Sequence, residues 1–361
     1  MRVLIDSHLD LAWNALSFNR DQTLSVAEIR RQDAHMTDER GRGRATTSLP
    51  ELRRANAAVV VATLLARGGP DQKPKDVYRR TDLDFATQSI AHATAQGQLA
   101  YYRLLEEEGH VRVIRTRADL DAHWLEWQRD SQRTPLGYIL SMEGADPITS
   151  PAQAEAWWNQ GLRAAGLAHY GKSHYAHGTH TDGPLSEKGV ELLWEFMRLG
   201  VILDVTHLSD QSFFQAMDVF DGPVLASHHN CRVLVPGDRQ LTDQQIKLLL
   251  EREAVIGAAL DAWMLYPGWE RGKTSPEVVG LEAVADHIDH VCQIAGNARH
   301  SAIGSDLDGG FGKEQTPRDL DTFSDLHKLE GILAARGYSD ADIDLIFHKN
   351  WLRFFRRALP A

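Results

Sequence analysis

The chain has 361 residues, is 43% hydrophobic and 25% charged, and carries a formal net charge of -11, as expected for a globular protein with a full core. The acidic balance argues against a nucleic-acid partner, because phosphate binding needs a basic face, and no apolar run approaches the roughly 18 residues that span a bilayer. With only Cys231 and Cys292 and no visible leader, we expect a cytoplasmic protein without disulfides and without a membrane partner.

Apolar strands alternate with helical patterns along the chain. The first strand begins at Val3, and the second, from Ala57, is a continuous apolar run typical of a parallel sheet covered on both faces. Between them, residues 19–56 are polar and rich in arginine, which predicts a loop insertion. Eight strands are predicted in all, beginning near residues 3, 57, 137, 162, 200, 223, 254 and 300.

Helices are predicted between most of these strands, at 83–107, 117–128, 151–159, 186–199, 209–217, 242–252 and 276–295, and two or three more close the chain within 320–359. Ser186, Ser209 and Thr242 stand where N-caps are expected. Alternating strands and helices imply parallel pairing with right-handed crossovers. The pattern therefore predicts an α/β fold, a (β/α)8 TIM barrel forming a single domain over 1–361. An open doubly wound sheet is the alternative, but no Gly-x-Gly-x-x-Gly follows a strand.

Polar side chains follow the predicted strands. His8 and Asp10 are two residues apart at the end of the first strand, so their side chains point to the same side. Alone the pair has a simpler interpretation, in which His8 caps a turn and Asp10 starts a helix. In a barrel the C-terminal ends of all the strands meet at one mouth. Further candidates follow the other strands: Glu143, His169, His207, His228 and Asp306.

This mixture of imidazoles and carboxylates suits zinc or another divalent metal. Two ions about 3.5–4 Å apart need a carboxylate between them, and Glu143, followed by Gly144, is the natural bridge. The remaining ligands divide into one pair for each ion: His8 and Asp10, and His207 and His228. A water molecule shared by the two ions would become the nucleophilic hydroxide.

Asp306 is the uncommitted carboxylate, and it can take a proton from that water and pass it to a leaving amine. Its alternative role is to cap the turn at 305–310, which would suit Asp308 better. Other chemistries fit less well, because the chain has no Gly-x-Ser-x-Gly elbow, no P-loop and no activating surroundings for Cys231.

The order of motifs resembles the membrane (renal) dipeptidase family of zinc metallopeptidases, within the amidohydrolase superfamily. The resemblance runs from Asp6 to about Phe355 and is most specific around three segments: Asp-Val-Thr-His at 204–207, Ala-Ser-His-His-Asn at 226–230 and Gly-Ser-Asp-Leu-Asp-Gly at 304–309. It implies a (β/α)8 barrel, two Zn²⁺ ions and hydrolysis of dipeptides, with tolerance for a D-residue at the C-terminal position. It also allows a homodimer.

By this resemblance His8 and Asp10 hold the first zinc ion and Glu143 bridges to the second, which His207 and His228 hold. His169 matches the histidine that holds the scissile carbonyl oxygen. Arg239, which the pattern of strand ends does not indicate, matches the arginine that binds the substrate carboxylate. Asp306 matches the acid/base aspartate.

The sequence also departs from the family. Asp261, after the seventh strand, is an extra carboxylate that would select a cationic amine or repel an acidic side chain, or else serve as a structural hydrogen-bond acceptor. The His-rich loop 174–180 is expected to line a pocket or to hold a further metal. An amidohydrolase acting on a non-peptide amide, an N-acyl amino acid or a lactone is therefore the alternative function, and a non-catalytic binding protein is the third.

Overall fold

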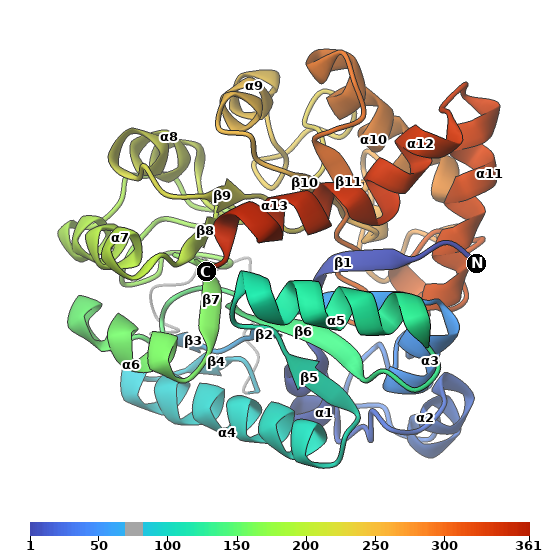
Figure 1. Cartoon of the computed structure of the whole chain (residues 1–361), viewed down its shortest axis with the longest axis horizontal. Coiled ribbons are helices and arrows are strands. Elements are labelled where there is room, and N and C mark those ends of the chain that lie inside the picture. The colour runs from blue at the N-terminus through green and yellow to red at the C-terminus, as the bar shows by residue number, and fades with distance from the viewer. Residues whose placement is uncertain (69–81) are drawn as a thin grey trace.

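The computed structural model of the protein describes residues 1–68 and 82–361 (Figure 1). The strands there are β1 (Leu4–Leu9), β2 (Ala57–Leu64), β3 (Arg67–Gly68), β4 (Asp84–Phe85), β5 (Val111–Val113), β6 (Leu136–Met142), β7 (Leu162–Gly166), β8 (Ile202–Asp204), β9 (Val224–Leu225), β10 (Ile256–Ala258) and β11 (Ser301–Ile303). The α-helices are α1 (Leu11–Phe18), α2 (Val26–Asp33), α3 (Leu49–Arg54), α4 (Gln88–Glu107), α5 (Arg117–Arg129), α6 (Ala154–Asn159), α7 (Glu187–Leu199), α8 (Asp210–Val219), α9 (Asp243–Glu251), α10 (Leu281–Ala295), α11 (Lys328–Ala335), α12 (Asp340–Asp344) and α13 (Asn350–Ala358).

Each of the eight strands predicted from the sequence is present, and the α/β class is confirmed. The main sheet is parallel, with the order β1-β2-β6-β7-β8-β9 and with β5 beside β6. β10 and β11 pair in parallel with each other, and a backbone bridge between Ala226 and Ile256 links the end of β9 to β10. The strand order thus follows the chain order, as right-handed βα units require.

The strands curl around a shared apolar interior. In β2, Val59 and Val61 point into this interior, while Val60 packs in the outer layer with the helices. The interior cluster also takes one residue from or beside each of the other predicted strands: Ile5, Ile139, Ala164, Ile202, Leu225, Val255 and Ala302. The curvature brings the C-terminal ends of the strands toward one region.

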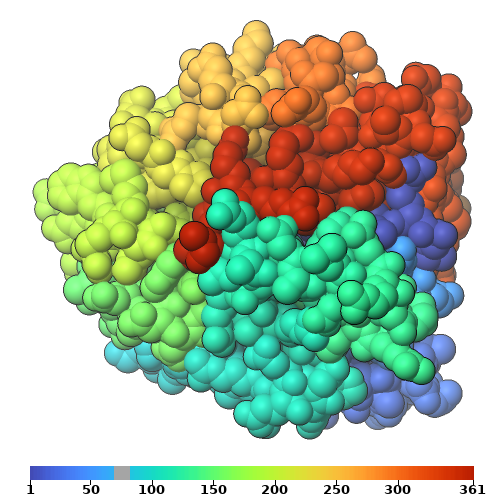
Figure 2. Space-filling model, viewed as in Figure 1, coloured from blue at the N-terminus to red at the C-terminus, as the bar shows by residue number. Residues whose placement is uncertain are grey.

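The last helix covers the end at which the strands begin. Trp351, Phe354 and Phe355 of α13 belong to the interior cluster. Asn350, the first residue of this helix, donates to the carbonyl of Ser301, the first residue of β11, at 2.8 Å. Figure 2 shows α13, in red, and α5, in teal, side by side across this face. The opposite end, where the strands stop, is left for polar side chains.

The predicted helix starts are largely confirmed, since Ser186, Ser209 and Thr242 accept hydrogen bonds from the third residue of their helices. The helix expected at 276–295 begins later, at Leu281, because the backbone at Gly280 is extended; a short 3₁₀ turn, Pro276–Val278, precedes it. No helix in the part of the chain that the structure describes is long and apolar enough to cross a membrane.

The segment 19–56 differs from the expected loop, because it contains α2 and α3. A capping box between Ser25 and Glu28 starts α2, which sequence reasoning overlooked in a segment poor in apolar residues. The segment is also fastened by buried charges: Arg20 lies 2.8 Å from Asp33, and both side chains are almost inaccessible. Local caps and paired charges therefore order a stretch that lacks a strong apolar pattern.

Candidate metal centre

The predicted ligands gather where the strands of the sheet end. His8 is the second-last residue of β1, and Glu143 follows β6 directly. Three further candidates stand three residues beyond their strands: His169 after β7, His207 after β8 and Asp306 after β11. His228 has the same spacing after β9. The structure therefore brings these side chains to one end of the fold, as the sequence predicted.

The carboxylate of Glu143 lies at the centre of the site. Its Oε1 atom is 3.1 Å from Nε2 of His207 and 3.3 Å from Nε2 of His228. The same oxygen is 3.5 Å from Nε2 of His8 and 3.7 Å from Nε2 of His169. One buried oxygen atom thus faces imidazole nitrogens from four strand ends.

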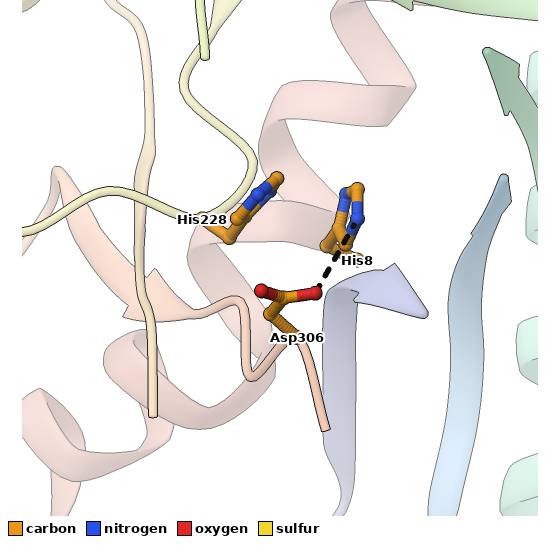
Figure 3. A group of neighbouring side chains, drawn as sticks. All are labelled: His8, His228 and Asp306. Atoms are coloured by element: carbon orange, nitrogen blue, oxygen red, sulfur yellow. Dashed lines mark ion pairs between the residues drawn. The ribbon is translucent and has the colours of Figure 1, made fainter. Parts of the chain in front are cut away.

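Asp10 and Asp306 extend the cluster around His8. Nε2 of His8 is 3.7 Å from Oδ2 of Asp10 and 3.8 Å from Oδ1 of Asp306. In Figure 3 the side chains of His8, His228 and Asp306 point toward one another from β1 and from two loops. Within the described residues, three overlapping groups have ligand atoms within 4.8 Å of one another: His8, His228 and Asp306; Glu143, His207 and His228; and His8, Asp10 and Glu143.

These residues fit a divalent cation. Burial lowers the pKa of His207 and of His228 well below the usual range, so both imidazoles are neutral and have a free lone pair. Burial also acts to lower the pKa of His8, but the carboxylates of Glu143 and Asp10 outweigh it and raise this pKa. Nε2 of His8 has no hydrogen-bond partner among the described residues. A cluster of buried carboxylates needs positive charge, and metal ions would supply it.

Asp306 is set apart by its surroundings. Burial raises the pKa of its carboxyl group well above the usual range, and the nearby carboxylates of Glu143 and Asp10 add to this effect, although His8 opposes it. A raised pKa suits a group that has to carry a proton during a reaction. Asp308, two residues on, is the structural residue of this turn, because its carboxylate accepts hydrogen bonds from the backbone and hydroxyl groups of Thr46 and Thr47.

The backbone is strained at two of these positions. His207 and Asp306 have φ values of 69° and 58°, in the left-handed region that residues with a Cβ rarely adopt. Gly144 also has a positive φ, and a Cβ at this position would lie 3.3 Å from the backbone nitrogen of His169. Such conformations persist where the surrounding structure fixes them, and they concentrate at functional sites.

Buried aspartates hold the strand ends in place, and sequence reasoning missed them. Oδ1 of Asp6 accepts hydrogen bonds from the backbone nitrogens of His8, at 2.9 Å, and Ser305, at 3.0 Å. Asp204 does the same for the backbone nitrogens of Thr206 and Ser227. Each aspartate thus joins two strand ends that carry candidate ligands. The signal in the sequence was a charged residue inside an otherwise apolar predicted strand.

Two threonine hydroxyl groups contact candidate ligands. Oγ1 of Thr63 donates to Oδ1 of Asp10, and Oγ1 of Thr179 is 2.9 Å from Nδ1 of His207. Asp10 occupies the N-cap position of α1 but makes no capping hydrogen bond with its side chain. The simpler interpretation of Asp10, as a helix start alone, therefore does not account for its carboxylate, which contacts Thr63 and faces His8.

Arg239 is buried beside the site. Its Nη2 atom donates to the backbone carbonyl of His228 at 2.9 Å, and the residue is 1% exposed. Nε and Nη1 have no hydrogen-bond partner in the described part of the chain. A buried guanidinium with two donors to spare is suited to an anionic group of a ligand.

The remaining predicted positions are not members of these ligand groups. Asp261 accepts a hydrogen bond from Nε2 of Gln315 at 2.7 Å, and burial raises its pKa to about 6. In the loop 174–180, Nδ1 of His177 contacts the carbonyl of Pro184, and the side chain of His180 is 45% exposed. None of the groups that could hold a metal within residues 1–68 and 82–361 includes a histidine of this loop.

An α/β fold with histidines and carboxylates gathered at its strand ends is typical of a metal-dependent hydrolase. Comparison with protein families matches residues 1–359 to the membrane dipeptidase family (peptidase family M19). The chain belongs to this family, and it is an enzyme of the hydrolase class. The resemblance noted in the sequence is thereby confirmed.

Similar proteins agree with this assignment. Dipeptidase verJ of Clonostachys rogersoniana is 30% identical over 223 residues, which are 60% of this chain and 54% of that relative, so the match spans about half of the fungal protein. The crystal structure of dipeptidase AC, a metallopeptidase of family M19, aligns with a TM-score of 0.80 at 23% identity, covering 100% of this chain and 99% of that one. A metallopeptidase from Rhodobacter sphaeroides, solved with a phosphinate mimic of the dipeptide L-Ala-D-Ala, has a TM-score of 0.79 at 22% identity, covering 99% of this chain and 100% of that one.

Proposed function

We propose that the protein is a dinuclear zinc-dependent dipeptidase whose substrates include dipeptides of the L-Xaa-D-Xaa type. The observation that carries this proposal is the position of Glu143, whose single Oε1 atom faces the Nε2 atoms of His207 and His228 at 3.1 and 3.3 Å. A carboxylate surrounded by imidazoles in this way is suited to bridge two cations. Family membership supports the reaction class.

His8 and Asp10 would hold one ion, His207 and His228 the other, and Glu143 both. Divalent ions at these positions would lower the pKa of a water molecule and polarise the scissile carbonyl group. Zinc is the expected metal because the ligand set mixes imidazole nitrogen and carboxylate oxygen.

Two side chains would then transfer the proton and stabilise the carbonyl oxygen. Asp306, 3.8 Å from His8, would accept a proton from the attacking water and return it to the leaving amine. His169, 3.7 Å from Glu143, would donate a hydrogen bond to the carbonyl oxygen as negative charge develops there. Both roles match those that the family resemblance implies.

Arg239 would bind the terminal carboxylate of the substrate. Its Nε and Nη1 donors are buried and have no partner within the described residues. Unpaired donors of a buried guanidinium group can bind the oxygens of a carboxylate through charge-assisted hydrogen bonds. The Rhodobacter sphaeroides relative was solved with a mimic of L-Ala-D-Ala, a dipeptide with a free carboxylate, which agrees with this role.

Asp261 would contact the amine of the substrate. Gln315 and the backbone nitrogen of Trp263 both donate to its Oδ1 atom, whereas Oδ2 has Arg271 at 4.0 Å. Oδ2 is therefore the oxygen that a cationic amine would approach. An acidic side chain on the substrate would be repelled by the same group.

We also propose that the strands close into a (β/α)8 barrel and that the chain is one domain. The bridge from Ala226 to Ile256 supports the closure between β9 and β10. Between β11 and β1, the support comes from Ser7 and Asp306. Oγ of Ser7 lies 3.2 Å from the carbonyl oxygen of Ile303, and the backbone nitrogen of Asp306 donates to the backbone carbonyl of His8 at 3.3 Å. Closure would bring Asp306 to the ligands on β1.

A substrate panel tests the proposed function. Purified protein with added zinc is given L,L- and L,D-dipeptides, the same dipeptides with an amidated C-terminus, N-acyl amino acids and lactones. We expect the free dipeptides to be hydrolysed fastest and the amides at least about tenfold more slowly, since the amides lack the carboxylate that Arg239 would bind. Preferential hydrolysis of N-acyl amino acids or lactones would overturn the dipeptidase proposal in favour of a different amidohydrolase.

A further inference from the structure

The hydroxyl group of Ser227 stands between two candidate metal ligands. Its Oγ atom is 2.9 Å from Nδ1 of His228 and 3.4 Å from Nδ1 of His8. The two histidines belong to or follow the two edge strands of the main sheet, β1 and β9, and their ring centroids are 3.7 Å apart. One oxygen atom therefore contacts the nitrogen of each ring that faces away from Glu143.

Asp204 fixes the direction of this hydroxyl. Its Oδ2 atom accepts a hydrogen bond from Oγ of Ser227 at 2.5 Å, and its Oδ1 atom accepts from the backbone nitrogen of the same serine at 3.1 Å. Because a carboxylate only accepts hydrogen bonds, the single proton of the hydroxyl goes to Asp204. The two lone pairs of Ser227 are then left for donors: Nδ1 of His228 is the nearest, while Nδ1 of His8 and the hydroxyl of Thr206, 3.2 Å away, share the other lone pair.

This direction decides where the histidines carry their protons. If Nδ1 of His228 and of His8 donates to Ser227, the lone pair of each ring in its metal-binding form is on Nε2. These Nε2 atoms are the ones that face Glu143, at 3.3 and 3.5 Å. A group that fixes the orientation and tautomer of a metal-binding histidine typically changes metal affinity 10- to 100-fold when it is removed.

The backbone at Ser227 packs closely against the residues that follow β11. A Cβ at Gly304 would lie 1.8 Å from the carbonyl oxygen of Ser227, so only glycine permits this close approach of β11. Ser7 donates its hydroxyl proton to the same carbonyl. Ser7 is fully buried here, but its hydroxyl contacts the backbone carbonyls of Ser227 and Ile303 and not a histidine.

We propose that Ser227, oriented by Asp204, is a positioning residue that presents Nε2 of both His8 and His228, and so couples the two metal sites. The inference rests on the proposed function, because it assumes that these histidines bind metal. Thr179 has the corresponding role for one ligand only, since its Oγ1 atom is 2.9 Å from Nδ1 of His207.

Three variants separate this proposal from a general packing effect: Ser227→Ala, Thr179→Val and Ser7→Ala as the matched buried control. Zinc is titrated into each metal-free protein in competition with a chelator of known affinity. We expect Ser227→Ala to weaken both binding steps on the order of 10- to 100-fold, Thr179→Val to weaken one, and Ser7→Ala to stay within about twofold of the wild type. Nitrogen NMR of histidine-labelled, metal-free protein should show Nδ1-protonated His228 in the wild type and a mixture of tautomers in Ser227→Ala.

The possible outcomes separate the positioning role of Ser227 from the proposed dipeptidase function. If the wild type binds no zinc, the proposed function fails, whereas the NMR result still supports or refutes the tautomer assignment. If the wild type binds two ions but Ser227→Ala binds them like Ser7→Ala, the positioning role is wrong and the function stands. Weakening of a single step in Ser227→Ala would overturn the coupling of the two sites.

Discussion

His207 and Glu143 lie with Nε2 and Oε1 3.1 Å apart, although the strands that precede them, β8 and β6, are not neighbours in the sheet. Strand β7 runs between them, so the contact depends on the curl of the sheet and on loops that turn inward beyond the strand ends. The positive φ of His207 is part of this turn. The centre is therefore a product of the fold, assembled from distant segments of the chain.

Replacement of Arg239 by alanine should chiefly weaken substrate binding. We expect KM for free dipeptides to rise on the order of 10- to 100-fold. The slow hydrolysis of amidated dipeptides should change little, because the amides lack the carboxylate that Arg239 would bind. Steady-state kinetics measure both. Arg232→Ala is the control, since Arg232 lies in the same loop but pairs with Asp210. An unchanged KM in Arg239→Ala would remove this residue from carboxylate binding.

Asp306→Asn should lower kcat and leave bound metal in place. Asparagine keeps the size of the side chain but cannot take up and release a proton at neutral pH, so we expect kcat to fall about 100- to 10,000-fold with KM within a few-fold of the wild type. Zinc content is measured on the same samples. A kcat close to that of the wild type, with metal bound, would rule out Asp306 as the acid/base.

The titration of Asp261 should appear in the pH dependence of stability. Burial raises its pKa to about 6 from the usual 3.8, so between these values the folded state binds more protons than the unfolded state, and stability increases as the pH falls. Relative to Asp261→Asn, the wild type should therefore gain up to about 3 kcal/mol of unfolding free energy between about pH 6.5 and pH 4.

Urea unfolding of both proteins across this range measures the difference, in which the titration of all other groups largely cancels. A difference between the two proteins that does not change with pH would show that Asp261 titrates in the ordinary range. A change of the opposite sign, with the wild type losing stability relative to Asp261→Asn as the pH falls, would show that this carboxylate is stabilised by its partners.

Asp308→Ala should destabilise the fold by about 3 kcal/mol or more, because a buried carboxylate that accepts hydrogen bonds from Thr46 and Thr47 is lost and these donors are left unpaired. Asp21→Ala is the control, because Asp21 is an exposed aspartate of the segment that contains Thr46 and Thr47, and its side chain accepts hydrogen bonds from the neighbouring Thr23. This variant should change stability by less than about 0.5 kcal/mol. Equal midpoints of thermal unfolding for the two variants would contradict the structural role of Asp308.

The sequence was sufficient for much of the fold, because buried parallel strands are continuous apolar runs and helix starts carry cap residues. Each predicted strand is present, and Ser186 and Thr242 cap the expected helices. The helices of 19–56 were missed because α2 depends on a capping box and paired charges more than on an apolar stripe. The short 3₁₀ turn before α10 likewise depends on one backbone conformation, at Gly280.

For the site, spacing after strands was enough to select the candidate ligands, since strand ends meet in parallel α/β folds. It was not enough to find groups that act through a ligand. Ser227 is simply the residue before His228, and Thr179 lies in a loop with little family resemblance, so their contacts depend on three-dimensional placement. The roles assigned to individual ligands, a homodimer and a cytoplasmic location stay predictions.

The central claim is that two ions held around Glu143 carry out the hydrolysis of dipeptides. The most direct test is to measure zinc per chain by mass spectrometry together with the hydrolysis of an L,D-dipeptide, for the wild type and for His207→Ala, before and after chelation. We predict about two ions per zinc-loaded wild-type chain, loss of activity on chelation, recovery with zinc, and no turnover in His207→Ala. Full activity in the variant, or in wild-type protein with less than about one ion per chain, would contradict the account.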